Sequence, residues 1–217
     1  MTDQNSHPVI PEGAILTRRQ ALFDLALTLL LAAAYVVAEN LSLPKRWILP
    51  AITLAMAGFA LHVSRRGNET LADLGFTRSQ LRRASLETAL FTIAAAAGIL
   101  TYAALTGSRL WLSSMALLLP IYPLYGLAQQ AIFQGIIHRR LLLLLGKPWL
   151  CILLTSLAFA LVHLGNSTLV ALTFVAAFFW SWIYARHPNL WPLGISHGIL
   201  AALTYPLVLG DNPLQRF

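Results

Sequence analysis

The sequence is poor in charged residues, which make up 11% of its 217 positions, whereas hydrophobic residues make up 58%. A soluble domain usually carries about a quarter charged residues. Apolar runs close to the roughly 20 residues of a bilayer-spanning helix recur along the chain. The composition therefore excludes an ordinary soluble domain and predicts an all-α fold, a polytopic membrane helical bundle.

Cysteine is nearly absent, since Cys151 is the only one. A single cysteine excludes an internal disulfide and a cysteine metal cluster. The net charge of +7 is compatible with a nucleic-acid partner, but the arginines stand at the ends of apolar runs, where membrane orientation explains them better. We therefore expect the lipid bilayer as partner, with no nucleic acid, metal or other cofactor.

The apolar runs predict about seven transmembrane helices. Thr17 and Gln20 form a predicted capping box at the start of the first, and Asp24 and Glu87 are placed in first turns, where the helix dipole favours anions. Whether the long fourth span is one helix or two stays open. The predicted spans are 21–38, 47–63, 86–105, 110–137, 149–164, 168–184 and 190–209.

The positions of Lys and Arg predict the orientation. Most of them fall on the inside if the N-terminus is cytoplasmic, which is the asymmetry of the positive-inside rule. We expect a multi-pass protein of a bacterial plasma membrane with its N-terminus in the cytoplasm. The basic connection 65–85 is either a short interfacial helix on anionic headgroups or a solvated loop. We divide the chain into a polar cytoplasmic tail (1–17), N-terminal helices with this loop (18–109), a core (110–210) and a C-terminal tail (211–217).

Few polar side chains lie inside the predicted spans, and such residues are the informative ones in a membrane protein. No Asp or Glu occurs between Glu87 and Asp211. Taken alone, the glutamines suit interhelical hydrogen bonds, the histidines suit packed side chains, and the aromatic residues 178–184 suit lipid or interface contacts. The polar candidates are Gln129, Gln130 and Gln134 on the fourth span, His163 on the fifth and His197 on the seventh.

Three short motifs on these spans resemble those of the CAAX-protease and bacteriocin-processing (Abi) family of intramembrane endopeptidases. They are GLAQQAIFQG at 126–135, FALVH at 159–163 and HGILA at 197–201. The family pattern is Glu-Glu-x-x-x-Arg, then Phe-x-x-x-His, then His-x-x-x-Asn. The resemblance covers roughly residues 110–210 and implies a helical membrane bundle that cuts prenylated proteins or peptides. Residues 74–78, LGFTR, also resemble a segment often found upstream in the family.

The sequence departs from the family pattern at four positions. Gln129 and Gln130 stand in place of the two glutamates, Gln134 in place of the arginine, and Ala201 in place of the asparagine. A glutamine amide cannot take a proton from water, as the family's first glutamate is held to do. Alanine lacks the donor that, by resemblance, helps a histidine hold the substrate oxygen. The matching positions are Phe133, Gly135, Phe159, His163 and His197.

We interpret the sequence as a catalytically impaired member of this family that binds a membrane segment or a lipidated peptide or protein without cutting it. Two alternatives stay open. One is a residual endopeptidase in which His163 is the base and a glutamine positions the water. The other is a structural subunit of a membrane complex, in which the polar site is vestigial.

Overall fold

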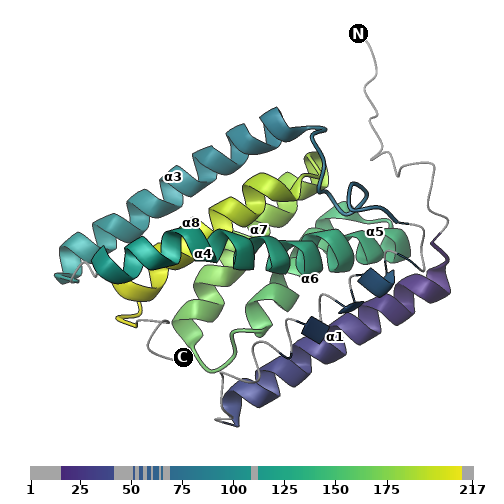
Figure 1. Ribbon diagram of the computed structural model, residues 1–217, viewed down its shortest axis with the longest axis horizontal. Coiled ribbons are helices and arrows are strands. Elements are labelled where there is room, and N and C mark those ends of the chain that lie inside the picture. Colours follow the sequence, from purple (N-terminus) through teal and green to yellow (C-terminus); the bar gives the residue numbers. More distant parts are fainter. Residues whose placement is uncertain are drawn as a thin grey trace.

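The computed structural model (Figure 1) describes residues 16–41, 69–108 and 112–211, with positions 51, 54–55, 58–59, 61–63 and 65 between them. Throughout these residues the regular structure is helical, which confirms the predicted all-helical class. About half of the predicted second span, 47–63, lies outside the described residues. The helices are α1 (Arg18–Asn40), α3 (Leu81–Thr106), α4 (Leu112–Gln130), the π-helix η1 (Ala131–His138), α5 (Arg139–Leu145), α6 (Pro148–Leu161), α7 (Ser167–Arg186) and α8 (Leu190–Leu207).

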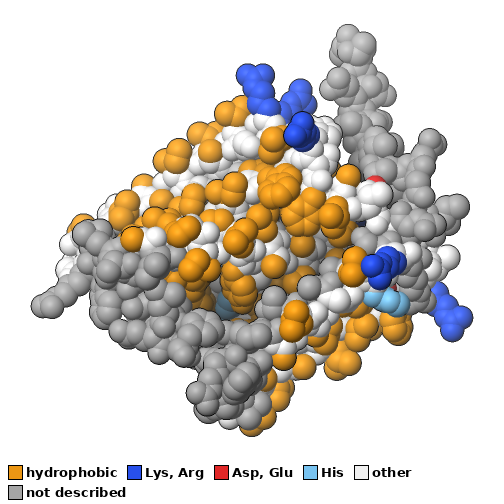
Figure 2. All heavy atoms as spheres, in the orientation of Figure 1, with side chains coloured by type: hydrophobic (Ala, Val, Ile, Leu, Met, Phe, Trp, Pro, Cys, Tyr) orange, Lys and Arg blue, Asp and Glu red, His pale blue; other side chains and the backbone are white. Residues whose placement is uncertain are grey.

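Three of the described helices, α1, α3 and α7, are long and apolar enough to cross a membrane. Apolar side chains are spread over the described surface that Figure 2 shows. The Lys and Arg side chains stand at its upper and right-hand edges, where Figure 1 shows the start of α3 and the meeting of α1 with α5. An apolar surface with cations confined to its edges suits a lipid environment.

The start of α1 is the predicted capping box. The Gln20 N–H donates to the Thr17 hydroxyl at 3.2 Å, and the Thr17 N–H donates to the Gln20 side-chain oxygen at 2.9 Å. The predicted first-turn positions of Asp24 and Glu87 are wrong, because no acidic residue occupies the first turn of α1 or α3. Both carboxylates instead pair with arginines far along the chain, Asp24 with Arg140 and Glu87 with Arg186.

The fourth predicted span is one continuous helical path, α4–η1–α5, which runs across the centre of the bundle in Figure 1. Pro120 and Pro123 lie within α4. Its middle part changes to the wider π-helix between Ala131 and His138. A π-helix turns side chains away from the positions that an α-helix would give them, and such segments often occur at functional sites.

Helix α8 packs against α4 through glycines, so that the two backbones come close together. A β-carbon added at Gly198 would lie 2.3 Å from the Pro123 nitrogen, and one at Gly126 would lie 2.4 Å from the Gly194 carbonyl oxygen. Gly194 and Gly198 form a Gly-x-x-x-Gly pair, the spacing that lets membrane helices approach closely. His197 lies inside this pair and is therefore held against α4.

Residues 69–80, here called the strap, precede α3 and are built of turns. They match neither the interfacial helix nor the solvated loop that the sequence suggested, because they dock on the bundle. Tyr184 Oη donates to the Leu74 carbonyl at 2.9 Å, and the Leu190 N–H donates to the Gly75 carbonyl at 2.9 Å. The Leu74 side chain is buried, and α8 begins directly beneath the strap.

Candidate functional site

The structure brings side chains of all three motifs together around the Phe159 ring. The Phe133 ring of η1 lies 4.5 Å from it, centroid to centroid. The His163 ring lies 6.0 Å away at the end of α6, and the His197 ring of α8 lies 5.4 Å away. Aromatic contacts of this length favour packed, fixed rings. The two histidines therefore border one aromatic residue, although 34 positions separate them in the sequence.

Gln129 and Gln130 end α4, directly before the π-helix that carries Gln134. Gln130 and Gln134 are completely buried, whereas Gln129 is partly buried. The Gln134 amide nitrogen donates to the Ser181 hydroxyl of α7 at 2.9 Å. Ala201 follows His197 by one turn of α8 and is partly buried. The family pattern has an asparagine at this position. The Ala201 side chain has no polar atom, so it offers no hydrogen bond here.

His197 is held by Trp180 of α7. The two rings stack with centroids 4.9 Å apart and an angle of 26° between their planes. Trp180 Nε1 donates to the Ser196 hydroxyl at 3.0 Å, and the Thr92 hydroxyl of α3 donates to the same oxygen at 2.7 Å. This chain of contacts fixes the orientation of α8 beside the glutamines.

Several polar atoms of this cluster are buried without a hydrogen bond to any described residue. They are the amide nitrogen and oxygen of Gln130, the amide oxygens of Gln129 and Gln134, and Nδ1 of His197. A buried polar group without a partner costs about 1–3 kcal/mol, so native proteins satisfy nearly all of them. The cluster therefore has unused donors and acceptors that suit a polar, uncharged ligand.

The cluster contains no described carboxylate that can act as a base. Asp24 and Glu69 bond Arg140, and Glu87 bonds Arg186, so these acids are engaged elsewhere. Gln134 and His197 contact Ser181, Trp180 and Phe159, which carry no charge. Among the described residues no three His, Cys, Asp or Glu side chains come together as metal ligands would. Hydrogen bonding is therefore the chemistry that the amides provide here.

Sequence reasoning missed Trp180 and Ser181, because it assigned the aromatic segment 178–184 to lipid or interface contacts. Trp180 is 2% exposed, Ser181 is fully buried and Tyr184 is 3% exposed, so at these three positions that interpretation is wrong. A serine between two tryptophans was the available signal, since interfacial aromatics do not need a buried hydroxyl. The Gly-x-x-x-Gly spacing around His197 was the second unused signal.

The helical bundle and its neutral polar cluster define the class as an integral membrane protein with a buried site between helices. The family model described as Type II CAAX prenyl endopeptidase Rce1-like matches residues 111–203, which contain all three motifs. This match agrees with the family predicted from the three motifs, and it covers the part of the chain that carries them. No curated protein and no solved structure gave a match to this chain.

Proposed function

We propose that this protein is a catalytically impaired member of the CAAX-protease-like family that binds a membrane segment or a lipidated peptide without cleaving it. The single observation that carries the proposal is the Gln130 side chain, fully buried with neither amide atom bonded to a described residue. The amide NH2 group donates hydrogen bonds and the amide oxygen accepts them, so together they match the C=O and N–H groups of a polypeptide backbone.

Cleavage needs more than binding. A water that attacks a peptide bond must lose a proton to a base, which contributes about 10²–10⁴-fold in rate. The positions of the family's two glutamates hold Gln129 and Gln130, whose amides are not basic. An oxygen-binding donor typically adds about 10²–10³-fold, and Ala201 cannot provide one. The site thus keeps the contacts that hold a peptide while it lacks the groups that activate water.

We further propose a multi-pass arrangement in a bacterial plasma membrane with a cytoplasmic N-terminus. The support is the grouping of Lys and Arg at two neighbouring edges of the molecule, near the starts of α1 and α3 (Figure 2). Cations gather on the cytoplasmic side of membrane proteins. In this arrangement the tail 1–17 is cytoplasmic, and residues 110–210 form the core that holds the site.

Binding of a fluorescent farnesylated peptide to the purified protein in nanodiscs tests the proposal. Gln130→Leu should weaken binding about tenfold or more, because the peptide loses buried hydrogen bonds worth about 1–3 kcal/mol. Fluorescence anisotropy gives the dissociation constant. Thr101→Val, at an exposed threonine of α3, is the control and should bind as the unmodified protein does. Equal affinity for both variants would contradict the proposal and favour the structural-subunit alternative.

A further inference from the structure

The strap, residues 69–80, lies against the end of the helices that carry the polar site. A β-carbon added at Gly135 would lie 3.1 Å from the Leu74 carbonyl oxygen and 3.4 Å from Leu74 Cβ. Gly135 directly follows Gln134 in η1. Tyr184, which bonds the Leu74 carbonyl, follows Ser181 by about one turn of α7. The strap therefore touches both helices at the residues next to the Gln134–Ser181 hydrogen bond.

The far end of the strap is tied to the start of α8. The Asn189 side-chain nitrogen donates to the carbonyls of Thr77 and Ser79 at 2.7 and 2.9 Å. The Phe76 ring packs edge-on against the Trp191 ring with centroids 5.4 Å apart. The strap thus crosses from η1 to α8 and covers the end of the bundle at which η1, α7 and α8 meet.

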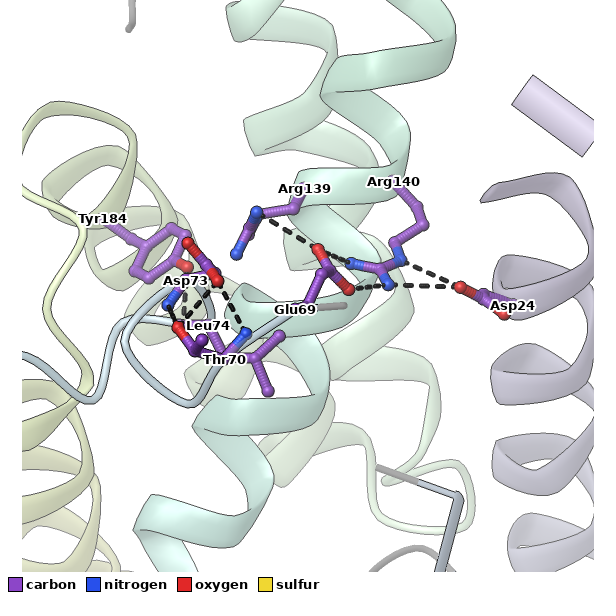
Figure 3. A network of polar contacts seen from close by, with 8 residues as sticks. All are labelled: Asp24, Glu69, Thr70, Asp73, Leu74, Arg139, Arg140 and Tyr184. Atoms are coloured by element: carbon purple, nitrogen blue, oxygen red, sulfur yellow. Dashed lines mark hydrogen bonds and ion pairs between the residues drawn. The ribbon is translucent and has the colours of Figure 1, made fainter. Parts of the chain in front are cut away.

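The near end of the strap is clamped by a buried ion cluster, drawn in Figure 3. Glu69 is the first residue of the strap, and Arg140 binds both of its carboxylate oxygens. Arg140 also binds Asp24 of α1 at 3.1 Å. Arg139 pairs with the same Glu69 at 3.2 Å. Two arginines and two carboxylates balance one another. A buried, hydrogen-bonded cluster of this kind fixes a single position for the segment that carries it.

Asp73 holds the turn of the strap in shape. The Thr70 N–H and hydroxyl donate to its carboxylate at 2.6 and 2.7 Å. Burial alone would raise the pKa of Asp73, but these hydrogen bonds and the positive charge of Arg139 outweigh burial and hold the pKa below its usual value. The carboxylate therefore stays ionised at neutral pH and keeps its hydrogen bonds to Thr70, which hold the shape of the turn.

Beyond the ion cluster, which anchors Glu69, the strap from Leu74 to Ser79 is held in a way that allows release without unfolding the helices. Its backbone carbonyls accept hydrogen bonds from side chains and from the first N–H group of α8. Exchange of each such bond for a bond to water costs only about 0.5–1.5 kcal/mol. Leu74, which is buried, and Phe76, which packs against Trp191, are the apolar side chains that must withdraw. Turn segments with few apolar contacts open at a lower free energy than packed helices do.

We propose that the strap is the gate of the polar site: docked, it closes this end of the bundle, and its release admits the peptide. This proposal rests on the proposed function, because the strap would regulate the same binding site. The proposal also gives a role to the segment LGFTR (74–78), whose Leu74 and Gly75 form the contact with η1, α7 and α8.

A reversible disulfide across this contact tests the gate. Leu74→Cys/Gly135→Cys, in a Cys151→Ala background, places the two β-carbons close to the separation of about 3.5–4.5 Å that a disulfide requires. The purified full chain is treated with diethyl pyrocarbonate, which modifies accessible histidines, before and after reduction with dithiothreitol. Mass spectrometry follows His197, which is 8% exposed, and uses the exposed His62 as internal reference.

We expect His197 to react about tenfold or more slowly in the oxidised form than in the reduced form, with His62 unchanged, because the disulfide blocks local opening. Equal rates at His197 in the two forms would overturn the gate. If the double-cysteine variant does not fold or does not cross-link, Tyr184→Phe is the second test of the gate. This change removes the hydrogen bond to the Leu74 carbonyl and should speed the reaction of His197 with diethyl pyrocarbonate. An unchanged rate would overturn the gate.

This measurement uses no peptide ligand. Loss of peptide binding in the nanodisc assay would therefore contradict the proposed function while the gate could still be observed. Conversely, a strap that never opens would leave peptide binding to be explained by another route into the site.

Discussion

Replacing Arg140 by leucine is expected to lower the free energy of unfolding by about 3–5 kcal/mol, because removal of one partner leaves buried charges uncompensated. Arg140 is 1% exposed, and its two partners, Asp24 and Glu69, are 3% and 5% exposed. Through them it joins α1, the strap and α5 (Figure 3). The measurement is denaturant or thermal unfolding of the purified protein in one detergent.

The matched control is Arg18→Leu at an exposed arginine, whose side chain bonds the Leu144 carbonyl at the surface. Its effect should stay within about 0.5 kcal/mol. The triple change Arg140→Leu/Asp24→Leu/Glu69→Leu should recover most of the lost stability, since a buried ion cluster is replaced by apolar packing. An Arg140→Leu variant as stable as Arg18→Leu would show that the cluster does not clamp the strap.

Gly198→Ala is expected to disrupt the contact between α4 and α8. The new β-carbon would lie 2.3 Å from the Pro123 nitrogen and 2.6 Å from the Tyr122 carbonyl carbon, and backbone atoms cannot turn aside as a side chain can. The helices must separate, so the loss of stability should reach or exceed the upper end of the about 1–3 kcal/mol that overpacking usually costs. His197 moves with α8, so peptide binding should fall as well.

Gly98→Ala, in the interior of α3, is the control for the same chemical change. A β-carbon at Gly98 would meet no atom within 4 Å. Alanine there should stabilise the protein by about 0.5–1 kcal/mol, because glycine loses more conformational freedom in a helix. Equal unfolding midpoints for the two variants would contradict the close α4–α8 contact.

Local rules explain what the sequence predicted well. The capping box at Thr17 and Gln20 depends on residues three positions apart, and it is present as expected. The length of the hydrophobic runs predicted the all-helical class, because only helices and closed β-barrels satisfy their backbone hydrogen bonds inside a bilayer. The order and spacing of the three motifs pointed to one site, and their rings do meet at Phe159. Their roles in binding stay predictions.

Long-range partners explain what the sequence missed. The first-turn rule placed Asp24 by its distance from the helix start, yet its partner Arg140 lies 116 positions away. No local pattern marks the π-helix at 131–138, which determines the direction in which Gln134 points toward Ser181. The connection 65–85, which contains the strap, is predicted as an interfacial helix or a solvated loop, whereas its Leu74 side chain is buried against the bundle.

The most direct test of the account is a cleavage assay on the protein freed of host proteases. Farnesylated peptides and transmembrane peptides are incubated with it, and mass spectrometry detects the products. We expect no cleavage above the protein-free control, because Gln129 and Gln130 cannot take the proton that a family glutamate is held to accept. Cleavage by the unmodified protein that His163→Ala abolishes would contradict the account and establish the residual endopeptidase with a histidine base.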